Sequence, residues 1–126
     1  MESGRTSSFA VVERRLLLVD DEAPLLELLK RYLERVGYTV DACSNPESAL
    51  QLFAADPARY ALVLTDLTLE GMSGEQMIER MRALNPALRA IVSSGYPFQP
   101  KSAATAFLMK PYVPKMLVDA IAKMLK

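Results

Sequence analysis

Short apolar runs that end in polar residues constrain the fold of this chain more than any other feature. Helical patterns separate these runs, so strands and helices are predicted to alternate. An alternating chain of this kind needs right-handed crossovers and a mostly parallel sheet covered by helices on both faces. The sequence therefore predicts a doubly wound α/β fold with five strands. The expected strands are residues 16–19, 38–43, 60–65, 90–93 and 106–109.

The helical segments are bounded by residues that commonly start or stop helices. Gly37 follows the first segment and is placed to end it. Asn45 and Pro46 open the second segment as a cap and a first-turn proline. Two further amphipathic helix faces are expected over residues 77–84 and 117–124.

The connection between the last two strands is unusually short for a parallel crossover. Such a crossover normally takes about a dozen residues or more, most often with a helix. Here residues 95–106 only just meet that length, and Pro97 and Pro100 interrupt the first half. We therefore expect the fourth helix to be shortened or absent, with at most one or two turns after Pro100.

Composition excludes several classes of function. The 126 residues suit one domain, and 15 basic residues balance 15 acidic ones, so no global field favours nucleic acid or an anionic membrane. The chain has no histidine, which excludes histidine metal sites and Ser-His or Cys-His catalysis, and one cysteine, Cys43, which excludes an intrachain disulfide. We expect a cytoplasmic protein with a disordered tail over residues 1–13 and one domain over residues 14–126.

Charged side chains follow three of the apolar runs. Asp20 and Asp21 follow the first run, Asp66 ends the third, and Lys110 follows the last. Because ligands bind outside the carboxyl ends of parallel strands, these groups are expected to meet at one edge of the sheet. Two like charges about 4 Å apart repel by roughly 4 kcal/mol at an effective dielectric of 20. A divalent cation beside Lys110 would compensate three carboxylates, and oxygen ligands suit Mg²⁺. The sequence therefore predicts a Mg²⁺ site suited to phosphoryl chemistry.

Four motifs together resemble the receiver domain of two-component response regulators, over about residues 15–125. These are Leu-Val-Asp-Asp-Glu at 18–22, the strand-end Asp66 with two glycines after it, Ser-Gly-Tyr at 94–96, and Phe-Leu-Met-Lys-Pro-Tyr at 107–112. The resemblance implies a flavodoxin-like parallel sheet in the order 2-1-3-4-5. It also implies a signalling domain rather than an enzyme, with at most self-catalysed phosphorylation and dephosphorylation.

The resemblance implies a role for each acidic residue. Asp66 would accept a phosphoryl group from a phosphohistidine on a sensor histidine kinase or a phosphotransfer domain. Asp21 and Asp66 would bind Mg²⁺ directly, and Asp20 would act mainly through water. The backbone carbonyl of Thr68 would complete the protein ligands.

The remaining motif residues would act on the phosphoryl group or respond to it. By resemblance, Lys110 pairs with Asp66 and then with a phosphoryl oxygen, and the Ser94 hydroxyl swings to another such oxygen. Gly95 leaves room for that approach, and Phe107 resembles the aromatic that turns inward when Ser94 moves. The family also implies a cis peptide bond between Lys110 and Pro111.

Two features depart from the family pattern. Glu70 stands where the family usually has proline, which affects the loop after Asp66 rather than metal binding. The short crossover removes most of the fourth helix, so one face of the sheet near Tyr96, Phe98 and Phe107 is expected to lack its usual cover. We expect this face to be mobile or to bind a partner or a second copy of the chain.

Three other classes of function are weighed against a phosphorylation switch. The first is a receiver-like interaction module that binds its partner whether or not it is phosphorylated, which the altered crossover favours. The second is a Mg²⁺ phosphatase with an aspartyl nucleophile, which would need an Asp where Thr68 stands. The third is a flavodoxin, whose phosphate loop would be replaced here by repelling carboxylates.

Overall fold

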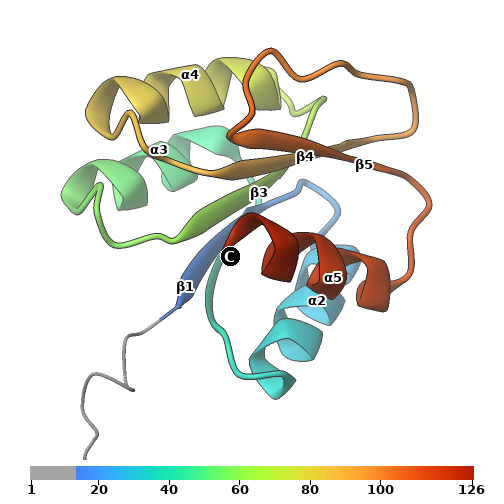
Figure 1. Cartoon of the computed structure of the whole chain (residues 1–126). Helices are drawn as coiled ribbons and strands as arrows, with labels where there is room; N and C mark the ends of the chain where they lie inside the picture. Colours follow the sequence, from blue (N-terminus) through green and yellow to red (C-terminus); the bar gives the residue numbers. More distant parts are fainter. Residues whose placement is uncertain (1–13) are drawn as a thin grey trace, which may run out of the picture.

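The structure, a computed structural model, describes residues 14–126 and contains one parallel sheet of five strands (Figure 1). The strand order is β2-β1-β3-β4-β5, which confirms the order 2-1-3-4-5. The expected tail, residues 1–13, lies outside the described residues. The strands are β1 Arg15–Val19, β2 Thr39–Cys43, β3 Leu62–Asp66, β4 Ala90–Ser94 and β5 Thr105–Met109.

Four helices cover the two faces of this sheet. Helices α3 and α4 lie on one face, and α2 and α5 lie on the other (Figure 1). The doubly wound arrangement predicted from the alternation of runs is therefore confirmed. The helices are α2 Ala23–Arg35, α3 Pro46–Ala55, α4 Gly74–Leu84 and α5 Pro114–Met124. None of the helices within residues 14–126 combines the length and the apolar character that crossing a membrane requires.

Local sequence explains where the helices begin. The Asn45 side chain accepts the backbone N–H of Ser48 at 2.8 Å, so the predicted cap of α3 is confirmed. Helix α4 starts with a reciprocal capping box between Ser73 and Gln76. At Gly74 a β-carbon would overlap the backbone carbonyl of Asp66, so only glycine lets α4 start against the end of β3.

The crossover from β4 to β5 contains no helix in residues 95–104. The prediction that the fourth helix is shortened or absent is therefore confirmed. Phe98 takes over part of its covering role: it packs against Ile78, Ala90 and Val92, with its ring centroid 6.2 Å from that of Phe107. The sheet face that was expected to lack cover is thus partly covered by the connection itself.

Hydrogen bonds attach this connection to the neighbouring helix. The guanidinium of Arg82, near the end of α4, donates to the backbone carbonyls of Leu88 and Ala104 at 3.1 and 2.9 Å. Burial lowers the pKa of Arg82, but its usual value is high enough for the group to stay charged. The short crossover is therefore held by α4 from one side and by β5 from the other.

Candidate functional site

The site lies at the carboxyl edge of the sheet, on the face covered by α2 and α5. On this face the inward side chains of β1, β3, β4 and β5 are apolar, and in each strand the next side chain on the same face is polar. Strand alternation places every second residue on the same face, so these four polar residues come together at the carboxyl edge. These polar residues are Asp20, Asp66, Ser93 and Lys110.

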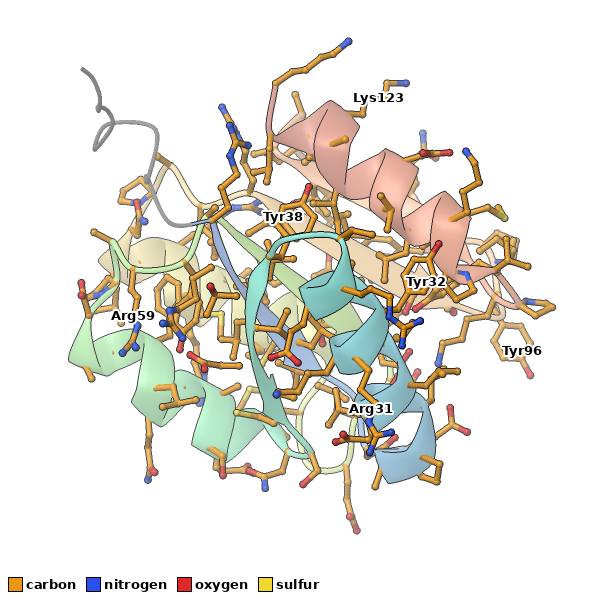
Figure 2. All side chains as sticks on the ribbon, turned by 90° about the horizontal axis from the view of Figure 1, so that it is seen from below. Arg31, Tyr32, Tyr38, Arg59, Tyr96 and Lys123 are labelled. Atoms are coloured by element: carbon orange, nitrogen blue, oxygen red, sulfur yellow. The ribbon has the colours of Figure 1, made fainter. Side chains whose placement is uncertain are left out.

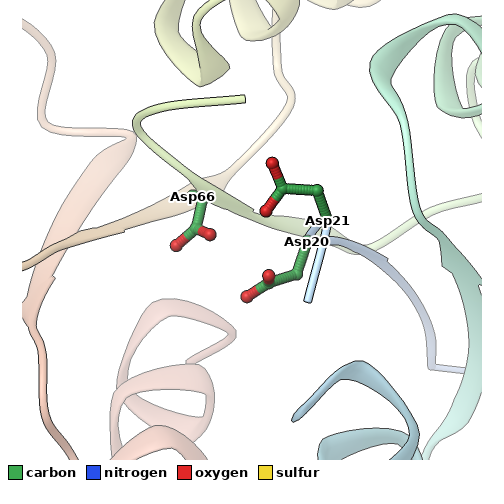
Figure 3. A group of neighbouring side chains, drawn as sticks. All are labelled: Asp20, Asp21 and Asp66. Atoms are coloured by element: carbon green, nitrogen blue, oxygen red, sulfur yellow. The ribbon is translucent and has the colours of Figure 1, made fainter. Parts of the chain in front are cut away.

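Three carboxylates meet at this edge (Figure 3). Asp20 and Asp66 are buried, Asp21 is exposed, and an oxygen atom of each lies within 4.8 Å of the others. The predicted convergence of these residues is therefore present. The donor set consists of oxygen atoms, with one carboxylate open to solvent, which fits a Mg²⁺ ion that keeps part of its water shell.

Lys110 supplies the positive charge of the site. Its Nζ lies 2.6 Å from Oδ1 of Asp66, 3.7 Å from Oδ2 of Asp20 and 3.6 Å from Oε1 of Glu22. Burial by itself lowers the pKa of this ammonium, but the bond to Asp66 and the surrounding carboxylates outweigh it, so the pKa is raised. Lys110 is therefore charged at neutral pH and compensates only part of the negative charge around it.

The pKa of Asp20 reflects this excess of negative charge and the burial of the carboxylate. Burial, together with the charge of Asp66, raises its pKa from 3.8 to about 6, against the backbone N–H of Glu22, which donates to it at 2.8 Å, and the charge of Lys110. Removing a carboxylate from water favours its neutral form unless a positive group replaces the lost hydration. Without a cation, Asp20 is thus held in an environment that opposes its charge, as expected for a residue built to face one.

An open hollow of about 260 Å³ adjoins Asp66. Thr68, whose carbonyl was predicted to bind the metal, lies on its wall after the end of β3 and forms an isolated antiparallel bridge with Ser73. The expected cis bond between Lys110 and Pro111 is also present. The hollow is lined by Asp66, Thr68, Ser93, Ser94, Gly95, Tyr96 and Lys110.

Ser93, for which no role was predicted from the sequence, is the serine bonded to Asp66. Its Oγ donates to Oδ1 of Asp66 at 3.1 Å, and its backbone pairs with Asp66 in the sheet register. Ser94 lines the hollow, but its Oγ accepts the backbone N–H of Tyr96 at 2.9 Å. Neighbouring strand residues point to opposite faces, so only the register between β3 and β4 identifies which serine reaches Asp66.

Tyr112 comes shortly after β5 and packs against the apolar cluster under α2 and α5. Burial raises the pKa of Tyr112 to about 12, so the hydroxyl keeps its proton at neutral pH.

Phe107, the predicted switch aromatic, lies in β5 beside Val92 of β4. It is half-buried and its ring is tilted against that of Phe98. It therefore lies on the α4 side of the sheet, next to the altered crossover, and its inward movement stays a prediction.

Comparison with known proteins identifies the family. Residues 16–122 match the response regulator receiver domain. The chain is 30% identical over 118 residues to the response regulator receiver protein CpdR of Brucella abortus, covering 89% of this chain and 97% of CpdR. It is 34% identical over 84 residues to the photosynthetic apparatus regulatory protein RegA of Cereibacter sphaeroides, but that match covers 67% of this chain and only 45% of RegA.

Solved structures agree with this assignment. The receiver domain of the hybrid histidine kinase CckA superposes with a TM-score of 0.81 at 25% identity, covering 89% of this chain and 99% of that one. The response regulator TrrA of Thermotoga maritima, solved with Mg²⁺ and a beryllofluoride, gives a TM-score of 0.77 at 29% identity, with the same coverage of 89% and 99%. By fold, motifs and matched length, the chain belongs to the response regulator receiver domain family.

Proposed function

We propose that this chain is a phosphoacceptor switch in which Asp66 receives a phosphoryl group from the phosphohistidine of a sensor histidine kinase or phosphotransfer domain. The observation that carries the proposal is the contact of 2.6 Å between Lys110 Nζ and Asp66 Oδ1, beside a cluster of carboxylate oxygens. The carboxylate and the ammonium lie beside one open hollow, which supports the roles proposed for Asp66 as nucleophile and for the carboxylate cluster as the cation site. The same proposal places the chain in the cytoplasm.

The residues of the site have distinct tasks in this transfer. Asp20, Asp21 and Asp66, with the backbone carbonyl of Thr68, would hold Mg²⁺, which when bound neutralises charge on the phosphoryl oxygens. Asp66 supplies the attacking carboxylate oxygen. Phosphoryl transfer depends mainly on positioning and on charge compensation, and Lys110 contributes to both without moving far from Asp66.

The response to phosphorylation would start at Ser94. Its hydroxyl lines the hollow and holds the Tyr96 backbone, so donating to a phosphoryl oxygen would exchange that contact for a charge-assisted bond. Phe107, which contacts the Phe98 ring from β5, would then turn inward and change the surface around the crossover.

Phosphorylation with a small donor tests the proposal directly. With acetyl phosphate and Mg²⁺, the wild-type chain should gain one phosphoryl group by intact mass, and Asp66→Asn should gain none. Asp41→Asn is a matched control, because Asp41 is a carboxylate of β2 remote from this edge, and it should be modified like the wild type. A phosphoryl group on the Asp66→Asn variant would show that another residue is the acceptor.

One observation favours a second candidate, an interaction module whose binding does not depend on phosphate. The connection between β4 and β5, which has no helix, leaves Tyr96 80% exposed (Figure 2), and Phe98 and Phe107 line an open hollow of the same connection. This surface could bind a partner or a second copy. Solution mass and hydrogen exchange across residues 95–106, with and without beryllofluoride, separate the two functions. In a switch, beryllofluoride changes the solution mass or the hydrogen exchange of the wild type but not of Asp66→Asn. In a constitutive module, the wild type and Asp66→Asn give the same values with and without beryllofluoride.

A further inference from the structure

The hydrogen bond from Ser93 to Asp66 has a chemical consequence for the phosphorylated state, provided that Asp66 is the acceptor proposed above. Oδ1 of Asp66 receives two donors, Ser93 Oγ at 3.1 Å and Lys110 Nζ at 2.6 Å. Ser93 is only 2% exposed, so no solvent competes freely for its hydroxyl. Its single proton is thus committed to the carboxylate.

The sheet register directs the Ser93 hydroxyl at Asp66. The two residues are partners in the pairing of β3 with β4, so their side chains leave the sheet on the same face. A serine hydroxyl has one proton to donate, and here it is donated to Oδ1 of Asp66. Strand geometry therefore holds this donor beside the reacting carboxylate.

We propose that Ser93 shortens the lifetime of the phosphoryl group on Asp66. In hydrolysis a water oxygen bonds to phosphorus, and the bond between phosphorus and the Asp66 oxygen breaks. The electron pair of that bond stays on Asp66, which becomes a carboxylate again, while the water loses a proton to solvent and inorganic phosphate leaves. Negative charge therefore returns to the group that Ser93 contacts.

A hydrogen bond to a carboxylate is stronger than one to the neutral carbonyl of an acyl phosphate. Ser93 consequently stabilises the leaving carboxylate more than the phosphorylated side chain, and lowers the barrier to loss of the phosphoryl group. The difference between charged and neutral hydrogen bonds corresponds to about a three- to tenfold change in rate.

The test is the decay of phosphorylated protein after the donor is removed. The full chain is loaded with acetyl phosphate and Mg²⁺, desalted into buffer with Mg²⁺, and followed by intact mass or a phosphate-affinity gel. The Ser93→Ala variant should decay about three- to tenfold more slowly than the wild type. Ser93→Thr restores a hydroxyl and should return the rate toward that of the wild type.

A control outside the site separates a chemical effect from a loss of stability. Tyr60→Phe removes a tyrosine hydroxyl that is bonded to Asp41, outside this site, and should leave the decay rate unchanged.

The possible failures are distinguishable. If the wild type gains no phosphoryl group, both the proposed function and this inference are wrong. If the wild type is phosphorylated but Ser93→Ala decays as fast or faster, the role of Ser93 is wrong and the phosphoacceptor stands.

Discussion

Two carboxylate sites in this molecule, the Asp41 cluster and the carboxyl-edge cluster, differ in how far their negative charge is compensated. On β2, Asp41 contacts the guanidinium of Arg15 at 3.1 Å and accepts the Tyr60 hydroxyl at 2.6 Å. The charge of Asp41 is therefore matched by a guanidinium and a neutral donor. At the carboxyl edge, by contrast, Asp20, Asp21 and Asp66 share Lys110.

This difference separates a group that stabilises the fold from one that works against it. Hydrogen bonding and charge pairing explain the Asp41 cluster completely. In the carboxyl-edge cluster, burial and the charge of Asp66 raise the pKa of Asp20. Folding alone would not favour such a group of like charges. A sequence retains such a cluster where a ligand supplies the missing charge, and local conflict of this kind is characteristic of functional sites.

The largest expected effect comes from breaking the balanced cluster. Asp41→Ala should lower the free energy of unfolding by about 3 kcal/mol, because it leaves the buried Tyr60 hydroxyl without its acceptor and removes the charge paired with Arg15. Urea denaturation measures the loss. Phosphorylation of the folded variant should be unchanged, and a loss of phosphorylation without unfolding would show that the two clusters are coupled.

Removing a charge from the carboxyl-edge cluster should raise the free energy of unfolding instead of lowering it. Asp20→Asn should raise the free energy of unfolding by about 2 kcal/mol at pH 7.5 in EDTA, since the amide carries no charge to desolvate. A destabilised variant under these conditions would mean that the cluster is already compensated.

The pH dependence of this gain follows from the raised pKa of Asp20. Its value of about 6 lies above the unfolded value of 3.8, so the folded state binds the proton more tightly. The wild type therefore loses stability as the pH rises from about 4 to about 6. The difference between Asp20→Asn and the wild type should be small near pH 4, grow across this interval and stay constant above it. Denaturation at pH 4, 5, 6 and 7.5 checks the shape.

A bound cation should have a smaller effect in the same direction. Mg²⁺ at ten times its dissociation constant should stabilise the wild type by about 1.4 kcal/mol. Asp21→Ala, which removes a predicted direct ligand, should lose this stabilisation more completely than Asp20→Ala, whose predicted contact is through water. Asp41→Ala is the control and should keep the full increment. Equal loss in the two site variants would contradict the division of roles between Asp20 and Asp21.

The sequence was sufficient for the fold and for the acidic edge because both depend on local patterns. Apolar runs and caps such as Asn45 define the elements, and parallel strands bring Asp20, Asp66 and Lys110 to one edge whatever the register. Pro97 and Pro100 likewise predicted the missing fourth helix, because proline interrupts the hydrogen bonding of a helix.

Contacts that depend on strand register were not predictable in this way. Two adjacent serines end β4, and family resemblance pointed to Ser94, whereas the pairing of Asp66 with Ser93 places the other hydroxyl on the carboxylate. The bonds of Asp41 with Arg15 and Tyr60 join residues 26 and 19 positions apart on different segments. Arg15 pairs with Thr39 rather than with Asp41 in the register of β1 and β2, and Tyr60 precedes β3, so no local pattern specifies either contact.

The smallest expected effect compares two hydroxyls, one at each carboxylate site. Tyr60→Phe should cost about 1 kcal/mol of stability: it removes the bond of 2.6 Å to Asp41 but keeps the ring that stacks on Phe53 with centroids 6.2 Å apart. Ser93→Ala also removes a hydroxyl bonded to a carboxylate, yet its main effect should be on the lifetime of phosphorylated Asp66, because Ser93 contacts the reacting group. Measuring unfolding and phosphoryl decay on both variants gives four values. Only Ser93→Ala should slow the decay. If both variants changed only stability, the two sites would differ in charge but not in function.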